Sequence, residues 1–204
     1  VSTTYNNYYI DALNMPSYRI DFIKETIAKL DNILGIDFQY VFNKTDANIS
    51  IYEHANATIG SNYGGQCNYE TDSLGYMNHE VALTSKNNDH YKNQGSNFWE
   101  HLFLHEIGHA LHLEHPFDND DGDVYGTTYS TTVEETAMAY GDPDEWGKYK
   151  SWFSLVDIEA LQSLWGDEDS TADTTAPLIT GPSGSAGASE SAKTINENTT
   201  TVHR

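Results

Sequence analysis

Isoleucine and leucine recur at spacings of three and four near the start of the chain, at Ile20, Ile23, Ile27, Leu30 and Leu34. This period places them on one face of an α-helix. The glycine that follows at position 35 is a typical stop signal. The pattern predicts an amphipathic helix over residues 17–34.

Two further helices are indicated by the residues that would start them. Asn97 and the glutamate three positions later have the spacing of a capping box, and the helix is expected to run to about Leu111. Ser154 and Asp157 form a second such pair. Gly166 is expected to end the helix that follows them.

Short runs of alternating hydrophobic residues lie between the first two predicted helices: Phe38, Tyr40 and Phe42, then Ile49 and Ile51, then Val81 and Leu83. Such alternation predicts short strands, and the polar gaps with glycines at 60, 64 and 65 predict the breaks between them. The order of helix, strands, long helix, loop and helix predicts an α+β domain with a small sheet.

The aromatic residues divide the chain into two parts. All 14 Tyr, 7 Phe and 4 Trp lie in residues 1–166, whereas residues 167–204 are rich in Ser, Thr, Ala, Gly and acidic residues. A segment of that composition cannot bury enough apolar surface to offset the entropy lost on ordering. We therefore expect a folded domain over residues 1–166 and a Ser/Thr/Gly-rich linker or disordered tail over 167–204.

Charge and cysteine content narrow the range of partners. Ten Lys and Arg against 31 Asp and Glu give a formal net charge of −21, which repels nucleic-acid phosphates and anionic membrane surfaces. No apolar run approaches the ~18 residues of a membrane span, so no membrane insertion is expected. Cys67 is the one cysteine, which excludes an intramolecular disulfide and a multi-cysteine zinc cage.

The candidate chemistry is carried by the run His105-Glu106-Ile-Gly-His109. On a helix, residues four apart lie one above the other, so both imidazoles can bind one zinc ion. Glu106 is offset by one position, where its carboxylate can take a proton from a water molecule bound to that ion.

Two histidines leave the ion short of a protein ligand. His115 comes six residues after His109 and is followed by a proline, so the helix must end near residue 112 and the backbone must reverse. Two alternatives stay open at this point. His112 could compete for the metal, and Glu134 or Glu135 could be the third ligand instead.

The run HEIGHALHLEHP over residues 105–116, with AMAY at 137–140, resembles the metzincin zinc peptidases, and among them the serralysin-type secreted bacterial proteases. The resemblance is strong over residues 97–166, where Trp165-Gly166 resembles the pair that ends the closing helix of that family. It implies a metzincin-like catalytic domain: a small mixed twisted sheet ending in an edge strand near residues 81–83, a long active-site helix, a Met-turn and a C-terminal helix.

The resemblance also implies roles for individual residues. His105, His109 and His115 would ligate zinc, with Glu106 as general base. Tyr140 would stabilise the oxyanion, a role that suits a phenol because it is a neutral donor at pH 7.

Two other positions near the metal motif follow from the same resemblance. Met138 would lie beneath the metal site without ligating it. His112 stands where the family usually has glycine, so we expect φ > 0 there, which costs a non-glycine residue ~1 kcal/mol.

These observations predict a zinc-dependent endopeptidase that hydrolyses protein or peptide bonds with a zinc-bound water activated by Glu106. We expect an extracellular protein, secreted or at the cell surface, that acts as a monomer on protein or peptide substrates. The alternative is a catalytically idle, zinc-stabilised module of a multidomain bacterial adhesin or surface protein. It is considered because PLITGPSGSAG and TINENTTTVH, within residues 167–204, resemble the approach to cadherin- or Ig-like repeats in large bacterial surface proteins.

Four weaker expectations concern other residues. Calcium is possible at Asp118, Asp120, Asp121 and Asp123, but Gly122 falls where an EF-hand loop needs an oxygen ligand, so no motif supports it. Cys67 is expected in a glycine-rich loop, and only a thiolate that reached the zinc would hold the enzyme latent. The strand near 81–83 could guide an extended substrate by strand addition, and His101 is expected to be a packed or solvated histidine.

Overall fold

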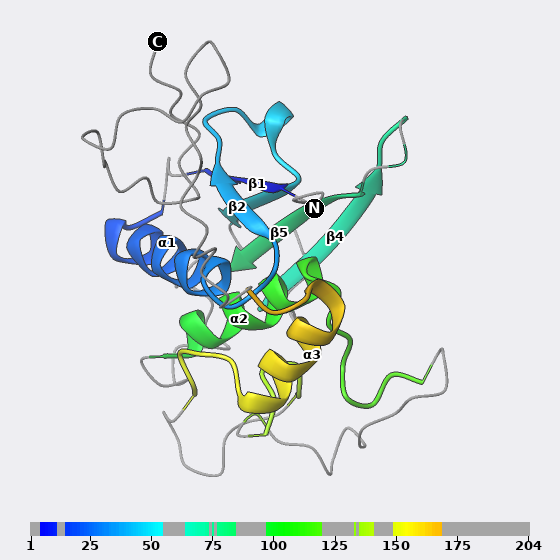
Figure 1. The fold of residues 1–204 in the computed structure, drawn as a ribbon. Helices are drawn as coiled ribbons and strands as arrows, with labels where there is room; N and C mark the ends of the chain where they lie inside the picture. Colours follow the sequence, from blue (N-terminus) through cyan, green and yellow to red (C-terminus); the bar gives the residue numbers. More distant parts are fainter. Residues whose placement is uncertain are drawn as a thin grey trace, which may run out of the picture. The chain divides into compact units, whose positions relative to one another are not determined.

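The computed structural model describes residues 5–11, 15–54, 64–73, 75, 77–84, 97–119, 133, 135–140 and 149–168. Along the chain these form β1 (Tyr5–Ile10), α1 (Ser17–Asp31), β2 (Asp37–Tyr40), a 3₁₀ turn η1 (Lys44–Asp46), β3 (Ile49–His54), β4 (Gly65–Thr71), β5 (Met77–Thr84), α2 (Phe98–Ala110) and α3 (Leu155–Trp165) (Figure 1). The α+β class predicted from the sequence is confirmed.

The five strands form one mixed sheet in the order β2-β1-β3-β5-β4. All neighbouring pairs are parallel except β4 and β5, which are antiparallel from Gly65 opposite Leu83 to Thr71 opposite Met77. The expectation that the strand near residues 81–83 is the edge is therefore wrong. β5 is an inner strand, and β4 forms the edge beyond it.

Cys67 lies in β4 rather than in a loop before the edge strand. The two glycines at 64 and 65 end one break, but the strand begins at the second of them. The residues that pair with β4 lie 6 to 18 positions further along the chain. Because the sequence of β4 is polar and has little hydrophobic alternation, the hydrophobic pattern does not predict this strand.

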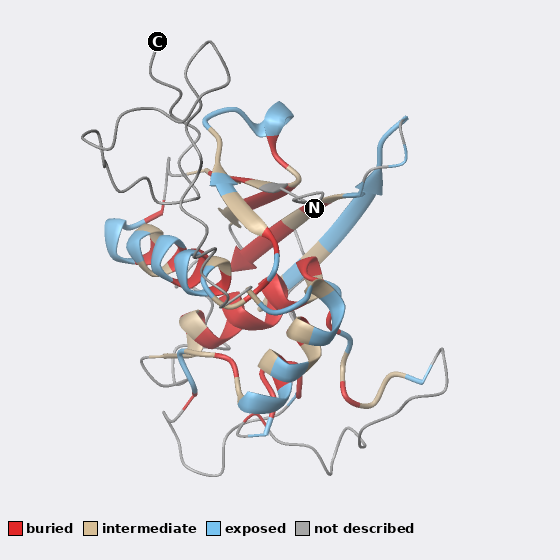
Figure 2. Ribbon diagram, in the orientation of Figure 1, coloured by how far each residue is buried: buried red, intermediate tan, exposed pale blue. Residues whose placement is uncertain are grey.

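The core lies between the sheet and the helices. Ile51 of β3, Val81 and Leu83 of β5, and Ile23 of α1 are fully buried. α2 packs against β4 and β5, and α1 packs against β2 and α2. Burial is greatest along β5 and α2 (Figure 2). Packing against the protein interior therefore fixes the position of α2, the helix that contains His105, Glu106 and His109.

The two predicted capping boxes have different outcomes. The box at Ser154 forms, because an extended backbone lets its hydroxyl accept from the Asp157 N–H while the Asp157 carboxylate accepts from the Ser154 N–H. The box at Asn97 does not form. With φ −95° and ψ 7°, Asn97 lacks the extended backbone of a typical cap, and its side chain makes no capping bond.

The segment that follows α1 contacts the C-terminal end of α3. α1 ends at Asp31 instead of residue 34, and the chain turns so that the Gly35 N–H donates to the Gly166 carbonyl at 2.9 Å. A Cβ on Gly35 would lie 2.9 Å from the Trp165 carbonyl oxygen, so a side chain there would prevent this contact. Residues 1–168 form one compact unit; residues 169–204 lie outside the described part, and the boundary expected at 166 stays a prediction.

Candidate metal centre

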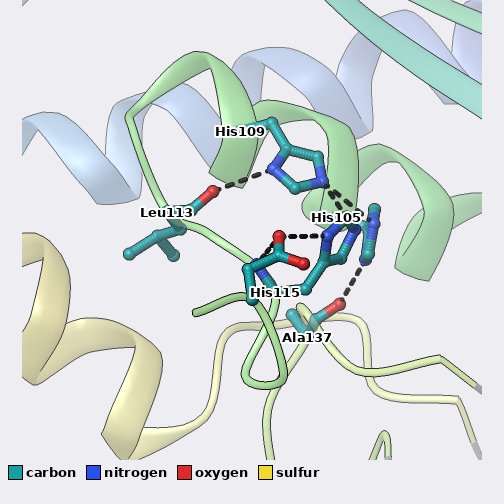
Figure 3. A network of polar contacts seen from close by, with 6 residues as sticks. His105, His109, Leu113, His115 and Ala137 are labelled. Atoms are coloured by element: carbon teal, nitrogen blue, oxygen red, sulfur yellow. Dashed lines mark hydrogen bonds and ion pairs between the residues drawn. The ribbon is translucent and has the colours of Figure 1, made fainter. Parts of the chain in front are cut away.

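Three histidines converge at the C-terminal end of α2 (Figure 3). His105 and His109 lie one helical turn apart, and their Nε2 atoms are 3.2 Å from each other. The helix ends at Ala110, His112 adopts φ +70°, and the chain reverses. This reversal brings the Nε2 of His115 to 3.1 Å from that of His109. The predicted positive φ at residue 112 and the predicted change of direction are both confirmed.

The other nitrogen of each ring is already engaged. Nδ1 of His105 lies 2.8 Å from the Ala137 carbonyl oxygen, and Nδ1 of His109 lies 2.8 Å from the Leu113 carbonyl oxygen. A carbonyl oxygen can only accept, so both Nδ1 atoms carry the proton. Nδ1 of His115 lies 2.8 Å from Oδ2 of Asp118, which accepts in the same way when ionised.

It follows that all three Nε2 atoms present lone pairs to one another. Neutral imidazoles in these tautomers cannot hydrogen-bond to each other through Nε2, so a cation is what satisfies all three at once. Tetrahedral coordination with metal–nitrogen distances of ~2.0–2.1 Å places ligand nitrogens roughly 3.3 Å apart. The Nε2–Nε2 distances from His109 to His105 and His115, 3.2 and 3.1 Å, are close to that value.

Within the described ranges, one set of three or more His, Cys, Asp or Glu residues has its ligand atoms close enough for a metal ion. It consists of His105, His109 and His115, whose ligand atoms all lie within 4.8 Å of one another. These side chains are therefore positioned to hold a divalent metal ion.

Burial keeps the helical histidines in the form that binds metal. It lowers the pKa of His105 to about 3, with His109 as the next largest influence. Burial also lowers the pKa of His109, and the neighbouring His115 lowers it further. Both rings are therefore neutral at physiological pH, with their Nε2 lone pairs available.

Glu106 lies against the beginning of the edge strand β4, at Gly65. It is 5% exposed and accepts a hydrogen bond from the backbone N–H of Cys67. Burial raises the pKa of Glu106 to about 8, although the Cys67 bond opposes the shift. A carboxyl group with such a pKa can accept and release a proton near neutrality.

Glycine at position 65 makes room for this carboxylate. A Cβ on Gly65 would lie 2.6 Å from Oε1 of Glu106 and 2.7 Å from its Cγ. No side chain fits in that space while Glu106 keeps its position, so the start of β4 shapes the site as much as α2 does.

The turn at residues 136–140 lies beside the histidines. Met138 is 2% exposed, and a Cβ on Gly108 would lie 2.6 Å from its Sδ, so the helix and the turn are in close contact at this glycine. Tyr140 is 50% exposed, and its ring centroid lies 4.5 Å from that of His115. The structure thus brings Tyr140 next to the third histidine.

Several candidate residues lie away from the histidine cluster. His112 is exposed, and its ring contacts His79 and Trp165 at centroid distances of 5.4 and 5.7 Å. It does not belong to the ligand set, and neither does Glu135, which is exposed. Glu134 lies outside the described residues.

The remaining sequence candidates also have defined places. Burial, with Glu106 as a smaller cause, raises the pKa of Cys67 to about 12, which opposes formation of a thiolate. His101 is buried and packs on Tyr149 at 5.0 Å, in agreement with a packed histidine. Asp118 contacts His115; Asp120, Asp121 and Asp123 lie outside the described residues.

Sequence reasoning missed three residues that the structure brings to the site. Asp118 was considered only for calcium, although its spacing of three from His115 could have suggested a contact. Gly65 was read as a break. Asp157 was recognised as a helix cap, but its further contacts with residues 136 and 137 had no signal in the sequence.

Comparisons with known proteins identify sequence relatives and a solved structure of similar fold. No family model matches the sequence. Over 109 residues, the chain is 34% identical to a serralysin of Photorhabdus luminescens and 32% identical to one of Photorhabdus laumondii subsp. laumondii. Each match covers 48% of this chain and 22% of the relative, so the chain matches about a fifth of the length of these curated relatives.

Among solved structures, the crystal structure of myroilysin resembles this fold with a TM-score of 0.50 at 14% sequence identity. That similarity covers 81% of this chain and 85% of the other. At this identity it supports the fold alone.

Proposed function

We propose, from the premise that this chain is a serralysin-like metzincin, that it is a zinc-dependent endopeptidase. The observation that carries the proposal is that the Nε2 atoms of His105 and His115 both lie close to that of His109, on the helix that also carries the buried carboxylate of Glu106. His105, His109 and His115 would hold the zinc, and the fourth coordination position would stay open for substrate or water, as in catalytic zinc sites.

Two residues of the chain, Glu106 and Tyr140, would then have separate roles in peptide hydrolysis. Zinc, when bound, supplies polarisation of the scissile carbonyl and a lower pKa for water. Glu106 takes the proton of the attacking water as the water oxygen bonds to the carbonyl carbon. It then passes this proton to the nitrogen of the leaving amine, and the C–N bond breaks as the carbonyl re-forms. Tyr140 donates a hydrogen bond to the oxygen on which negative charge develops.

The edge strand β4 is the place where an extended substrate would lie. Its residues from Asn68 to Thr71 are exposed. A peptide that pairs with this edge as an additional strand satisfies its backbone hydrogen bonds, whatever its side chains are. Glu106 lies directly beneath the beginning of this strand. This assignment replaces the inner strand near 81–83 as the substrate guide.

Protein or peptide substrates, an extracellular location and a monomeric state belong to the same proposal. Serralysin-type relatives support the first two, and the strong negative charge disfavours nucleic-acid partners. Within the described residues, no helix combines the length and apolar character needed to cross a membrane.

Metal removal tests the proposal directly. The chain is expected to degrade casein, to lose this activity after dialysis against a chelator, and to regain it when one equivalent of zinc is added. The measurement is release of acid-soluble peptides, with zinc content determined in parallel. A zinc-loaded, folded protein that cleaves neither casein nor a mixed peptide library would contradict the proposal.

Gly65→Ala is expected to lower kcat/KM by ~10²-fold, because a misplacement of ~1 Å can cost that much. The new methyl group would occupy space now filled by the Glu106 carboxylate, at 2.6 Å from Oε1. Zinc binding should persist, because the new methyl group displaces Glu106, which is not one of the three ligand residues. The measurements are casein cleavage and zinc stoichiometry.

Gln66→Ala is the matched control. Gln66 is exposed and adjacent in β4, with its side chain on the opposite face of the strand. It should keep near-normal activity. Equal activity of both variants would show that β4 does not determine the position of Glu106.

A further inference from the structure

Asp157 makes more contacts than a helix cap requires. It lies in the first turn of α3 and is 2% exposed. Its carboxylate accepts from the Ser154 N–H at 2.8 Å and from the Ser154 hydroxyl at 2.8 Å, which completes the cap. It also accepts from the Ala137 N–H at 2.9 Å and from the Thr136 hydroxyl, which lie 20 and 21 residues earlier in the chain.

The contact between Asp157 and Ala137 connects Asp157 to His105, one of the three candidate metal ligands. The N–H of Ala137 donates to Asp157, and the carbonyl of the same residue accepts from Nδ1 of His105 at 2.8 Å. Residue 137 is thus held on one side by Asp157 of α3. Its carbonyl in turn holds the His105 ring, as Figure 3 shows. The bond to Nδ1 determines that the lone pair is on Nε2.

The Thr136 hydroxyl extends the same network through the turn. It donates to Asp157 and accepts from the Met138 N–H at 3.0 Å. Met138 in turn lies against Gly108 of α2, one turn of helix from His105 and next to His109. Thr136, Ala137, Met138 and Asp157 are all buried, so water does not compete with the hydrogen bonds between them.

We propose that Asp157 is a positioning residue for the metal centre, which holds Ala137 where its carbonyl orients His105 and selects the metal-binding tautomer. Asp157 does not touch the metal or the substrate. Its removal lowers zinc affinity because the His105 ring loses its fixed orientation. This inference rests on the metal-binding part of the proposed function but not on peptidase activity.

The experiment compares Asp157→Asn with Ser154→Ala in the full chain. Ser154→Ala removes the side-chain half of the helix cap and leaves both contacts to residues 136 and 137. Zinc dissociation constants are measured by competition with a chelating indicator, and folding is checked by circular dichroism. Asp157→Asn is expected to weaken zinc binding by ~10–100-fold, the usual loss for an outer partner of a metal ligand, whereas Ser154→Ala should change it less than about threefold by the same reasoning.

Two outcomes overturn the proposal. The first is a zinc affinity of Asp157→Asn within threefold of wild type. The second is a loss of zinc affinity in Ser154→Ala as large as that in Asp157→Asn, because the effect would then come from helix capping. If Asp157→Asn does not fold, Thr136→Val decides, because it removes one contact to the turn and leaves the cap intact. Thr136→Val should weaken zinc binding by ~10-fold, at the lower end of the same range, and unchanged affinity refutes the proposal.

A second readout separates this inference from the proposed function. The ¹⁵N chemical shifts of the His105 ring report the tautomer in the metal-free protein. Wild type should show a proton on Nδ1, and Asp157→Asn a mixture of both tautomers. If wild type bound no zinc, the proposed function would fail, while the tautomer measurement would still decide the role of Asp157.

Discussion

Glu106→Gln is expected to lower the rate of peptide hydrolysis by about 10²- to 10⁴-fold, the usual contribution of a general acid–base group. The amide has nearly the same size, so it should fit beneath β4 and leave the three histidines in place. It has no basic oxygen that can take the proton of the attacking water. It therefore has no proton to pass on to the leaving amine. The measurement is the rate of casein or peptide cleavage at saturating zinc.

The zinc content of the same variant provides the control. One equivalent should bind to both wild type and Glu106→Gln, because the ligand nitrogens come from His105, His109 and His115. Absence of cleavage in both proteins, with zinc bound to both, would favour the idle adhesin-type module over the peptidase. Undiminished cleavage by Glu106→Gln would contradict the role of this carboxylate as general base.

Replacement of His115 by alanine should weaken zinc binding by more than the ~10–100-fold that loss of an outer partner causes, because it removes a direct ligand. The Nε2 of His115 lies 3.1 Å from that of His109, and no other described His, Cys, Asp or Glu residue completes the set. Activity should disappear with the metal. The dissociation constant for zinc, measured by competition, is the primary readout.

Glu135→Ala serves as the comparison for this prediction. Glu135 is exposed and does not belong to the histidine cluster, so its replacement should leave the zinc affinity unchanged. A loss of zinc in Glu135→Ala with retention in His115→Ala would instead support Glu135 as the third ligand. The two variants therefore decide between the two choices of third ligand.

The local parts of the site were predictable because their geometry repeats along the chain. Helical periodicity places His105 and His109 on one face, whatever surrounds the helix. Pro116 cannot continue a helix, and His112 is a side chain that tolerates positive φ, so the reversal that returns His115 could be expected from nearby residues. The cap at Ser154 was predictable for the same reason, since its hydrogen bonds join residues three positions apart.

Other features depended on contacts that no local pattern encodes. Asn97 has the residue type of a cap, but its backbone adopts a conformation in which its side chain makes no capping bond. The edge of the sheet was assigned to the wrong strand because β4 is polar and is recognised only by its pairing with β5. Gly65 has its effect because the fold brings β4 over Glu106, a residue 41 positions later in the chain.

By itself, then, the sequence determined which side chains could bind a metal and transfer a proton, since their spacing within one helix and one turn is a local property of the backbone. Only the tertiary structure decided which strand borders the site, why position 65 must lack a side chain, and how Asp157 is linked through Ala137 to His105. These are pairings between segments distant in the chain. Their energies depend on burial and mutual fit, which appear only when the whole domain is folded.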